Sequence, residues 1–205
     1  MEERSFYCVG SFINKLYLIG GWIKSCGKSL RSCYTFDINS STLNKIADLN
    51  VARELAACTV FEGKIVVTGG FNYYDRDLKS VEAYDYYENK WSYLSDMIEG
   101  RFDHAAVSMS NKLFVIGGRY TTSCEIFDSY SRQFTEIESD LTVPNMKSKY
   151  SMAACIGDYI LVFHSYSSYD ETTTYLYDVC ENKWSNIKCD FTKNLFDLSI
   201  FKYYI

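Results

Sequence analysis

An apolar segment that ends in two glycines recurs along this chain of 205 residues, and the recurrence restricts the fold more than any other feature. The copies are residues 16–21 (LYLIGG), 65–70 (IVVTGG) and 113–118 (LFVIGG), and a fourth copy at 160–165 (ILVFHS) keeps the apolar part without the glycines. A basic residue precedes each copy at a nearly fixed distance, and these residues are Arg4, Arg53, Arg101 and Lys149. A repeat of about 48 residues is typical of solenoids and propellers.

A second block follows each copy of the first block. It consists of an aromatic residue and an aspartate, and then a large apolar residue six positions after the aspartate. The pairs are Asp37 with Leu43, Asp85 with Trp91, Asp128 with Phe134, and Asp178 with Trp184. Four matches at one spacing exclude coincidence, and they divide the chain into repeats at 4–52, 53–100, 101–148 and 149–193. Residues 194–205 match the start of a fifth repeat.

Each repeat is expected to form four short strands, which we call a to d in chain order. Strand a is rich in small residues such as Ala and Cys, strand b is the Gly-Gly segment, strand c ends at the aspartate, and strand d holds the large apolar residue. Turn residues separate a from b and c from d. Small residues suit strands that crowd around a central axis, and glycine permits backbone angles and close approaches that other residues do not. The sequence therefore predicts an all-β protein built from radially arranged sheets.

These motifs resemble the Kelch repeat, and the resemblance extends from residue 4 to 205. Residues 81–91 (VEAYDYYENKW) are the closest match, whereas Leu43 and Tyr34 replace the expected Trp and Glu in the first repeat, and 164–165 replace the glycines in the fourth. The resemblance implies a single Kelch β-propeller region over 1–205, with four four-stranded blades and the start of a fifth, and hence an incomplete ring. Such a ring exposes apolar blade faces and strand edges, so we expect self-association.

The b–c and d–a loops vary in length between repeats, whereas the a–b and c–d turns are constant, and an antiparallel blade places the variable loops on one face. Binding residues gather on such loops, and the resemblance implies that this face contacts a partner protein or peptide. The candidates are Trp22, Arg53, Phe71, Arg101, Arg119, Lys149 and Tyr166. Their arginines favour an acidic motif. An alternative for the arginines and the lysine is a structural role, in which they pair with neighbouring blades or cap turns.

Composition and charge exclude several other functions. The net charge of −5 and the absence of a long basic run argue against nucleic-acid binding, and no apolar stretch reaches the ~20 residues that span a bilayer. The start of the chain lacks the pattern of a signal peptide, which predicts a cytoplasmic protein whose eight cysteines are free thiols. We expect no cofactor and no metal, since the chain has no Cys-x-x-Cys pair and only two histidines.

The function expected from the resemblance is protein binding without catalysis. Within the family, many such domains present substrates to a ubiquitin ligase through a preceding BTB domain, so one hypothesis is the recognition part of such an adaptor or a fragment of it. The alternative is a cytoskeletal protein that binds actin. An enzyme such as a Kelch-containing copper oxidase would need more histidine ligands than His104 and His164. We expect His104 to be structural, and Asp85 and Asp178 to stabilise turns.

Overall fold

The computed structural model describes residues 3–137, 150–165 and 172–187. These residues form β-strands joined by turns, and none of them lies in a helix. In this part of the chain, therefore, no helix is long and apolar enough to cross a membrane.

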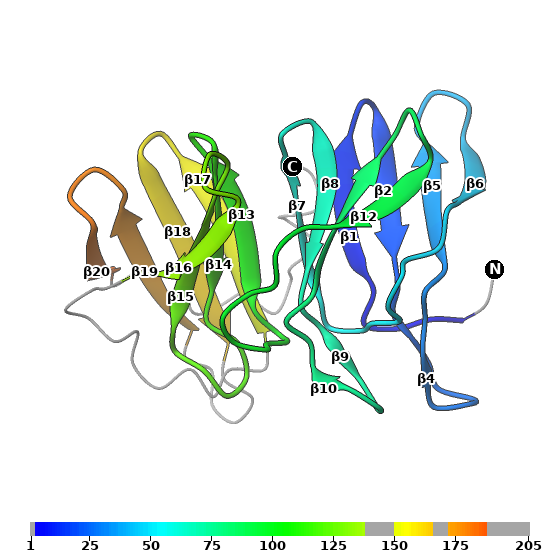
Figure 1. Ribbon diagram of the computed structural model, residues 1–205, viewed down its shortest axis with the longest axis horizontal. Coiled ribbons are helices and arrows are strands. Elements are labelled where there is room, and N and C mark those ends of the chain that lie inside the picture. The colour runs from blue at the N-terminus through cyan, green and yellow to red at the C-terminus, as the bar shows by residue number, and fades with distance from the viewer. Residues whose placement is uncertain (1–2, 138–149, 166–171, 188–205) are drawn as a thin grey trace.

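Four antiparallel sheets of four strands each, which we call blades 1 to 4, stand side by side in Figure 1. Within each blade the four strands pair in the order a, b, c, d. Blade 1 contains β1 (Cys8–Phe12), β2 (Lys15–Ile19), β5 (Cys33–Asp37) and β6 (Thr42–Ile46). Blade 2 contains β7 (Ala57–Phe61), β8 (Lys64–Thr68), β11 (Val81–Asp85) and β12 (Lys90–Tyr93). Blade 3 contains β13 (Ala105–Met109), β14 (Lys112–Ile116), β15 (Cys124–Asp128) and β16 (Gln133–Glu136), and blade 4 contains β17 (Tyr150–Ile156), β18 (Tyr159–Ser165), β19 (Thr172–Asp178) and β20 (Lys183–Ile187).

The hydrophobic core consists of three clusters, each of which lies between two consecutive blades. Tyr17 and Ile19 of blade 1 pack with Ile65 and Trp91 of blade 2, and equivalent clusters join blade 2 to blade 3 and blade 3 to blade 4. The a strands β1, β7, β13 and β17 lie next to one another in succession. Because blades 2 and 3 each pack on another blade with both faces, apolar residues occur on both sides of their inner strands.

The turn between strands c and d explains the repeated aspartate. Asp85 Oδ1 accepts hydrogen bonds from the backbone N–H groups of Tyr87 (3.0 Å) and Glu88 (3.1 Å). Asp178 does the same in blade 4, so the predicted turn role of both aspartates is confirmed. The aromatic residue before the aspartate packs on the large residue of strand d, as in the pair Tyr84–Trp91, whose ring centroids are 5.1 Å apart.

The prediction of an all-β chain with four four-stranded blades is confirmed, and the ring is open, since blades 1 and 4 are not joined among the described residues. The proposed fifth repeat lies outside those residues. The sequence did not indicate two small hairpins in the b–c loops. They are β3 (Trp22–Ile23) with β4 (Lys28–Ser29) in blade 1, and β9 (Phe71–Asn72) with β10 (Arg76–Asp77) in blade 2.

Candidate partner-binding face

The b–c and d–a loops lie together at one end of the blades, where the hairpins with β4 and with β9 and β10 project in Figure 1. The a–b and c–d turns lie at the opposite end. The alternation of strand directions produces this separation, as the loop-length argument predicted. We call the first end the loop face.

Two of the predicted binding residues, Arg53 and Arg101, are buried at the base of the loop face. Each is only 1% exposed. Arg53 Nη1 donates to the carbonyl oxygens of Gly69 (2.5 Å) and Ser80 (2.9 Å), and Nη2 forms an ion pair with Glu82 at 2.7 Å. The Arg53 guanidinium therefore ties the d–a loop that precedes strand a to the end of strand b and the start of strand c.

Arg101 repeats this arrangement one blade further on. Its Nη1 donates to the carbonyl oxygens of Gly117 (2.7 Å) and Ser123 (2.8 Å), and its Nη2 pairs with Glu125. The constant distance of 16 residues between the arginine and the first glycine in the sequence thus reflects a hydrogen bond within the blade.

The paired glutamates also hold the d–a loop that comes from the preceding blade. Glu82 accepts hydrogen bonds from the backbone N–H groups of Asn50 (2.7 Å) and Val51 (3.0 Å). Glu125 accepts from those of Ile98 (2.7 Å) and Glu99 (3.1 Å). A buried charged pair is tolerated when further hydrogen bonds satisfy its remaining atoms, and here the loop supplies them.

Blade 1 departs from this scheme at the position where the sequence has tyrosine in place of glutamate. Arg4 makes the same bonds to Gly20 O and Ser32 O, both at 3.0 Å. Its guanidinium carbon lies 4.9 Å from the centroid of the Tyr34 ring, so a cation–π contact replaces the ion pair.

The prediction that Arg53 and Arg101 contact a partner is therefore corrected. Both side chains are buried and leave no surface for a partner, and their Nη atoms donate to backbone carbonyls and to a buried glutamate. The structural alternative holds for both. The signal was present in the sequence: Glu82 and Glu125 are charges in the middle of otherwise apolar c strands, three residues before the repeated aspartate, and a charge in such a position needs a buried partner.

Arg119, which directly follows the third Gly-Gly pair, is exposed on the loop face. Its side chain is 40% exposed, and Nη1 lies 3.9 Å from Asp103 Oδ2. The guanidinium carbon lies 5.7 Å from the centroid of the Phe102 ring. The neighbouring Tyr120 is 78% exposed and packs edge-on against the same ring at 5.8 Å. A cation and an aromatic ring are thus held next to each other at the surface.

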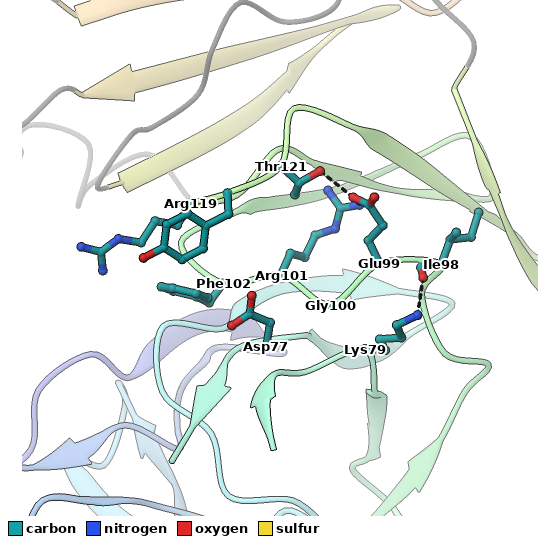
Figure 2. A pocket seen from close by; sticks show the side chains of 10 residues that line it. Asp77, Lys79, Ile98, Glu99, Gly100, Arg101, Phe102, Arg119 and Thr121 are labelled. Atoms are coloured by element: carbon teal, nitrogen blue, oxygen red, sulfur yellow. Dashed lines mark hydrogen bonds and ion pairs between the residues drawn. The ribbon is translucent and has the colours of Figure 1, made fainter. Parts of the chain in front are cut away.

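A pocket of about 370 Å³ lies beside these two residues, between the loops of blades 2 and 3. Figure 2 shows Asp77 and Lys79 along one side and Arg119 and Thr121 along the other, with Glu99 and Phe102 between them. Thr121 donates to Glu99 at 2.5 Å and Lys79 donates to Ile98 O at 2.6 Å. The pocket is large enough for one or two side chains of a partner, and charges of both signs line it.

Burial shifts the pKa of two carboxyl groups on this face. Burial raises the pKa of Asp103 to about 6, against the lowering effect of the Arg119 charge. Burial also raises the pKa of Glu54 to about 7. Hydrogen bonds from Thr121 and Ser123 lower the pKa of Glu99. Since the pKa of Asp103 is about 6, its carboxyl group is mostly ionised at neutral pH and forms the ion pair with Arg119.

The other predicted residues have mixed positions. Trp22 and Phe71 lie on the hairpins and are partly covered, since the Trp22 ring lies 6.0 Å from Phe6 and the Phe71 ring 5.4 Å from Phe102. Lys149 and Tyr166 lie outside the described residues. Tyr120 was missed, although its position directly after Arg119 in a variable loop was a signal for it.

The described residues contain no group of three or more His, Cys, Asp or Glu side chains that could hold a metal. His104 is buried, and its Nε2 lies 2.7 Å from Thr68 Oγ1 of blade 2. Burial and then the charges of Arg101 and Arg53 hold the pKa of His104 well below its usual range. The neutral ring therefore links two blades, which is the structural role expected of it. The side chain of His164 lies outside the described part of the chain.

Comparison with known proteins agrees with this architecture. The family model described as the KLHDC2/KLHL20/DRC7 Kelch-repeats domain matches residues 6–195. Kelch-like protein 38 of Rattus norvegicus is 33% identical over 127 residues, which are 62% of this chain and 21% of the relative. F-box/kelch-repeat protein At1g67480 of Arabidopsis thaliana is 30% identical over 58% of this chain and 33% of the relative. Alpha-scruin of Limulus polyphemus is 22% identical over 60% of this chain and 14% of the relative. The chain spans a third or less of these relatives. Because the family model covers most of it, the chain belongs to the Kelch-repeat family.

Proposed function

We propose that the chain is a protein-interaction module that binds its partner on the loop face, at the pocket beside Arg119. Membership of the Kelch-repeat family supports an interaction module. The observation that carries the choice of site is the exposure of the Arg119 guanidinium and the Tyr120 ring on the rim of a pocket. Arginine and tyrosine are common among the residues that dominate binding energy.

The proposed ligand is a peptide segment with an acidic side chain that reaches Arg119. A guanidinium binds a carboxylate with two parallel hydrogen bonds. Asp103 Oδ2 lies 3.9 Å from Arg119 Nη1, and the Arg119 side chain is 40% exposed. The carboxylates of Asp77 and Glu99 elsewhere in the pocket would repel a second acidic residue, so we propose a single acidic position followed by an apolar or aromatic one that contacts Tyr120.

The experiment compares binding by the wild-type chain with that of Arg119→Ala and Tyr120→Ala, in pull-downs from cell lysate quantified by mass spectrometry. Lys112→Ala is the matched control, since Lys112 is an exposed cation at the start of β14, at the opposite end of the blade. We expect Arg119→Ala to lower the affinity for specific partners roughly 30-fold, which corresponds to about 2 kcal/mol. Equal losses in Lys112→Ala would show that the binding face is wrong. Thermal melts of each variant serve as the folding control, and a melting temperature equal to that of the wild type excludes unfolding as the cause of lost binding.

In a longer parent protein this module would serve as the substrate-recognition part of a ubiquitin-ligase adaptor, and we propose this role and a cytoplasmic location. Co-purification of ligase subunits with the full-length parent tests the role. The actin-binding alternative stays a prediction, and co-sedimentation with filaments tests it.

We also propose that the open ring leads to self-association, since apolar blade faces are exposed at both ends of the described stack.

A further inference from the structure

The outer face of blade 1 is apolar and points away from blade 2. The strand register places Val9 beside Leu18, and Leu16 beside Phe36, which in turn lies beside Leu43. The opposite face of the same strands forms the core shared with blade 2. Val9 is 52% exposed and Leu43 is 42% exposed. The other three residues of this face are partly exposed, and they are Leu16, Leu18 and Phe36.

Within the stack, the equivalent residues of the following blades are all covered. Leu16, Phe36 and Leu43 correspond to Ile65, Tyr84 and Trp91 of blade 2, which are 0%, 2% and 4% exposed beneath blade 1. In blade 3 the corresponding residues are also buried, beneath blade 2, and they are Leu113, Phe127 and Phe134. The outer face of blade 1 is therefore one half of a blade–blade interface.

Blade 4 presents the other half of the same interface. Ala154, Leu161 and Leu176 lie in one row across its strands, and Met152 lies on the same face. Leu161 corresponds to Phe114 of blade 3, which is fully buried against blade 4. Met152 is 39% exposed, and Leu161 and Leu176 are partly exposed.

We propose that the outer face of blade 4 in one copy of the chain packs on the outer face of blade 1 in a second copy. This assembly rests on the self-association proposed above and specifies its geometry. A second copy is the occupant that the structure favours, because blade 4 against blade 1 continues the series of interfaces that blades 1 to 4 make three times. The contact is head-to-tail, so it joins different surfaces of the two copies.

The new interface is held together mainly by apolar contact. Inside the stack, Trp91 Nε1 of blade 2 donates to Ala47 O at the end of blade 1, at 2.9 Å. Leu43 at the equivalent position of blade 1 has no such donor. Association is therefore weaker than the packing of blades within a copy, and it is little affected by salt, because screening acts on charges and not on apolar burial.

The test is complementation between two variants, read as molar mass by light scattering after size-exclusion chromatography. One variant carries Val9→Glu and Leu43→Glu on blade 1, and the other carries Met152→Glu and Ala154→Glu on blade 4. All four residues are exposed in a single copy, so these changes leave the fold intact. We expect each variant alone to be a monomer, and their mixture to form a dimer with one copy of each, because each retains one intact face.

The outcomes separate the geometry from self-association itself. A mixture that stays monomeric while the wild-type chain associates would overturn the head-to-tail contact and leave self-association standing. A wild-type chain that is monomeric even at high concentration would overturn both, without any bearing on partner binding at Arg119. Tyr130→Glu is the control: Tyr130 is 84% exposed at the c–d turn of blade 3, and the change should leave association as in the wild type.

Discussion

The arginine of each of the first three repeats acts as a structural clamp, and a guanidinium is suited to this position because its five donors have a planar arrangement. Arg101 contacts Gly117 O, Ser123 O and Glu125, with the whole side chain buried. Lysine has one ammonium group and could not reach all of these acceptors at once. The same reasoning explains why Arg4 keeps its carbonyl contacts although Tyr34 stands where blades 2 and 3 have glutamate.

Replacement of Arg101 by glutamine should therefore destabilise the chain strongly. The change leaves the Glu125 carboxylate buried without its counter-charge, which costs about 3–5 kcal/mol. Arg132→Gln is the matched control in the same blade. Arg132 forms an ion pair with Glu62 at 2.7 Å, but both side chains are more than 40% exposed, so its loss should cost less than about 1 kcal/mol. Urea unfolding of both variants measures the difference, and equal costs would contradict the clamp.

Glu54 on the loop face makes stability depend on pH. Its pKa is raised from 4.5 to about 7 because the carboxyl group is partly buried, and its Oε2 atom has no hydrogen-bond partner. The folded chain thus holds this proton more tightly than the unfolded chain does, so stability falls as the pH rises from 4.5 to about 7. Above pH 7 the charged form costs on the order of 1 kcal/mol, less than the full shift implies since the group is partly exposed.

Glu54→Gln should accordingly stabilise the chain at pH 8 and have no such effect at pH 4, as measured by the free energy of unfolding at both values. Glu99→Gln provides a control of opposite sign. Hydrogen bonds from Thr121 and Ser123 lower the pKa of Glu99, so this substitution should destabilise the chain at pH 8 and matter less in acid. A stabilisation by Glu54→Gln that is equal at pH 4 and pH 8 would rule out the titration of this carboxyl group.

At the scale of the strand, the two glycines at the end of strand b allow one blade to approach the next. Gly69 has a φ of +53°, and a β-carbon there would meet Arg101 O at the start of the next blade. Gly70 N donates a hydrogen bond to that same oxygen at 2.9 Å. Gly20 has the equivalent position before blade 2, where a β-carbon would lie 2.5 Å from Arg53 O.

Gly69→Ala should therefore cost more than an alanine at a glycine with similar backbone angles but open surroundings. Gly63 in the a–b turn of blade 2 has a φ of +69°, and a β-carbon there would meet no atom within 4 Å, so Gly63→Ala tests backbone strain alone. We expect about 1 kcal/mol for Gly63→Ala and roughly 3 kcal/mol for Gly69→Ala, which adds a steric clash. Thermal unfolding compares the two. Similar losses would show that the contact with Arg101 O relaxes easily.

Strand order and turns could be predicted from the repeat, because the period and the aspartate spacing have direct local causes. The direction of a side chain on the loop face could not, since Arg53 of a d–a loop and Arg119 of a b–c loop are the same residue type at the same end of the blades. One lies beneath a glutamate from strand c and the other does not. The hairpins β3–β4 and β9–β10 were also missed, because strands of two residues have no detectable alternation. The pocket depends on how loops of different blades meet, which the repeat itself does not encode.

At the scale of the whole molecule, the neighbouring blade decides how much a repeat position contributes to stability. Leu43 and Trp91 occupy the same position of strand d, but Trp91 is 4% exposed beneath blade 1 and Leu43 is 42% exposed. Trp184 in blade 4 is 3% exposed against blade 3. Blades 2 to 4 each have a preceding blade, whereas no described residue covers the outer face of blade 1.

Trp91→Ala should thus destabilise the chain by about 3–5 kcal/mol, since it leaves a cavity between blades 1 and 2 and removes the hydrogen bond to Ala47 O. Leu43→Ala should cost less than about 1 kcal/mol in dilute protein, because the residue is 42% exposed and not part of the buried core. If a second copy covers blade 1, the cost of Leu43→Ala will grow with protein concentration, as burial in the assembly adds to stability by mass action. Unfolding curves at two concentrations test this. A cost that is small and constant would mean that Leu43 stays exposed.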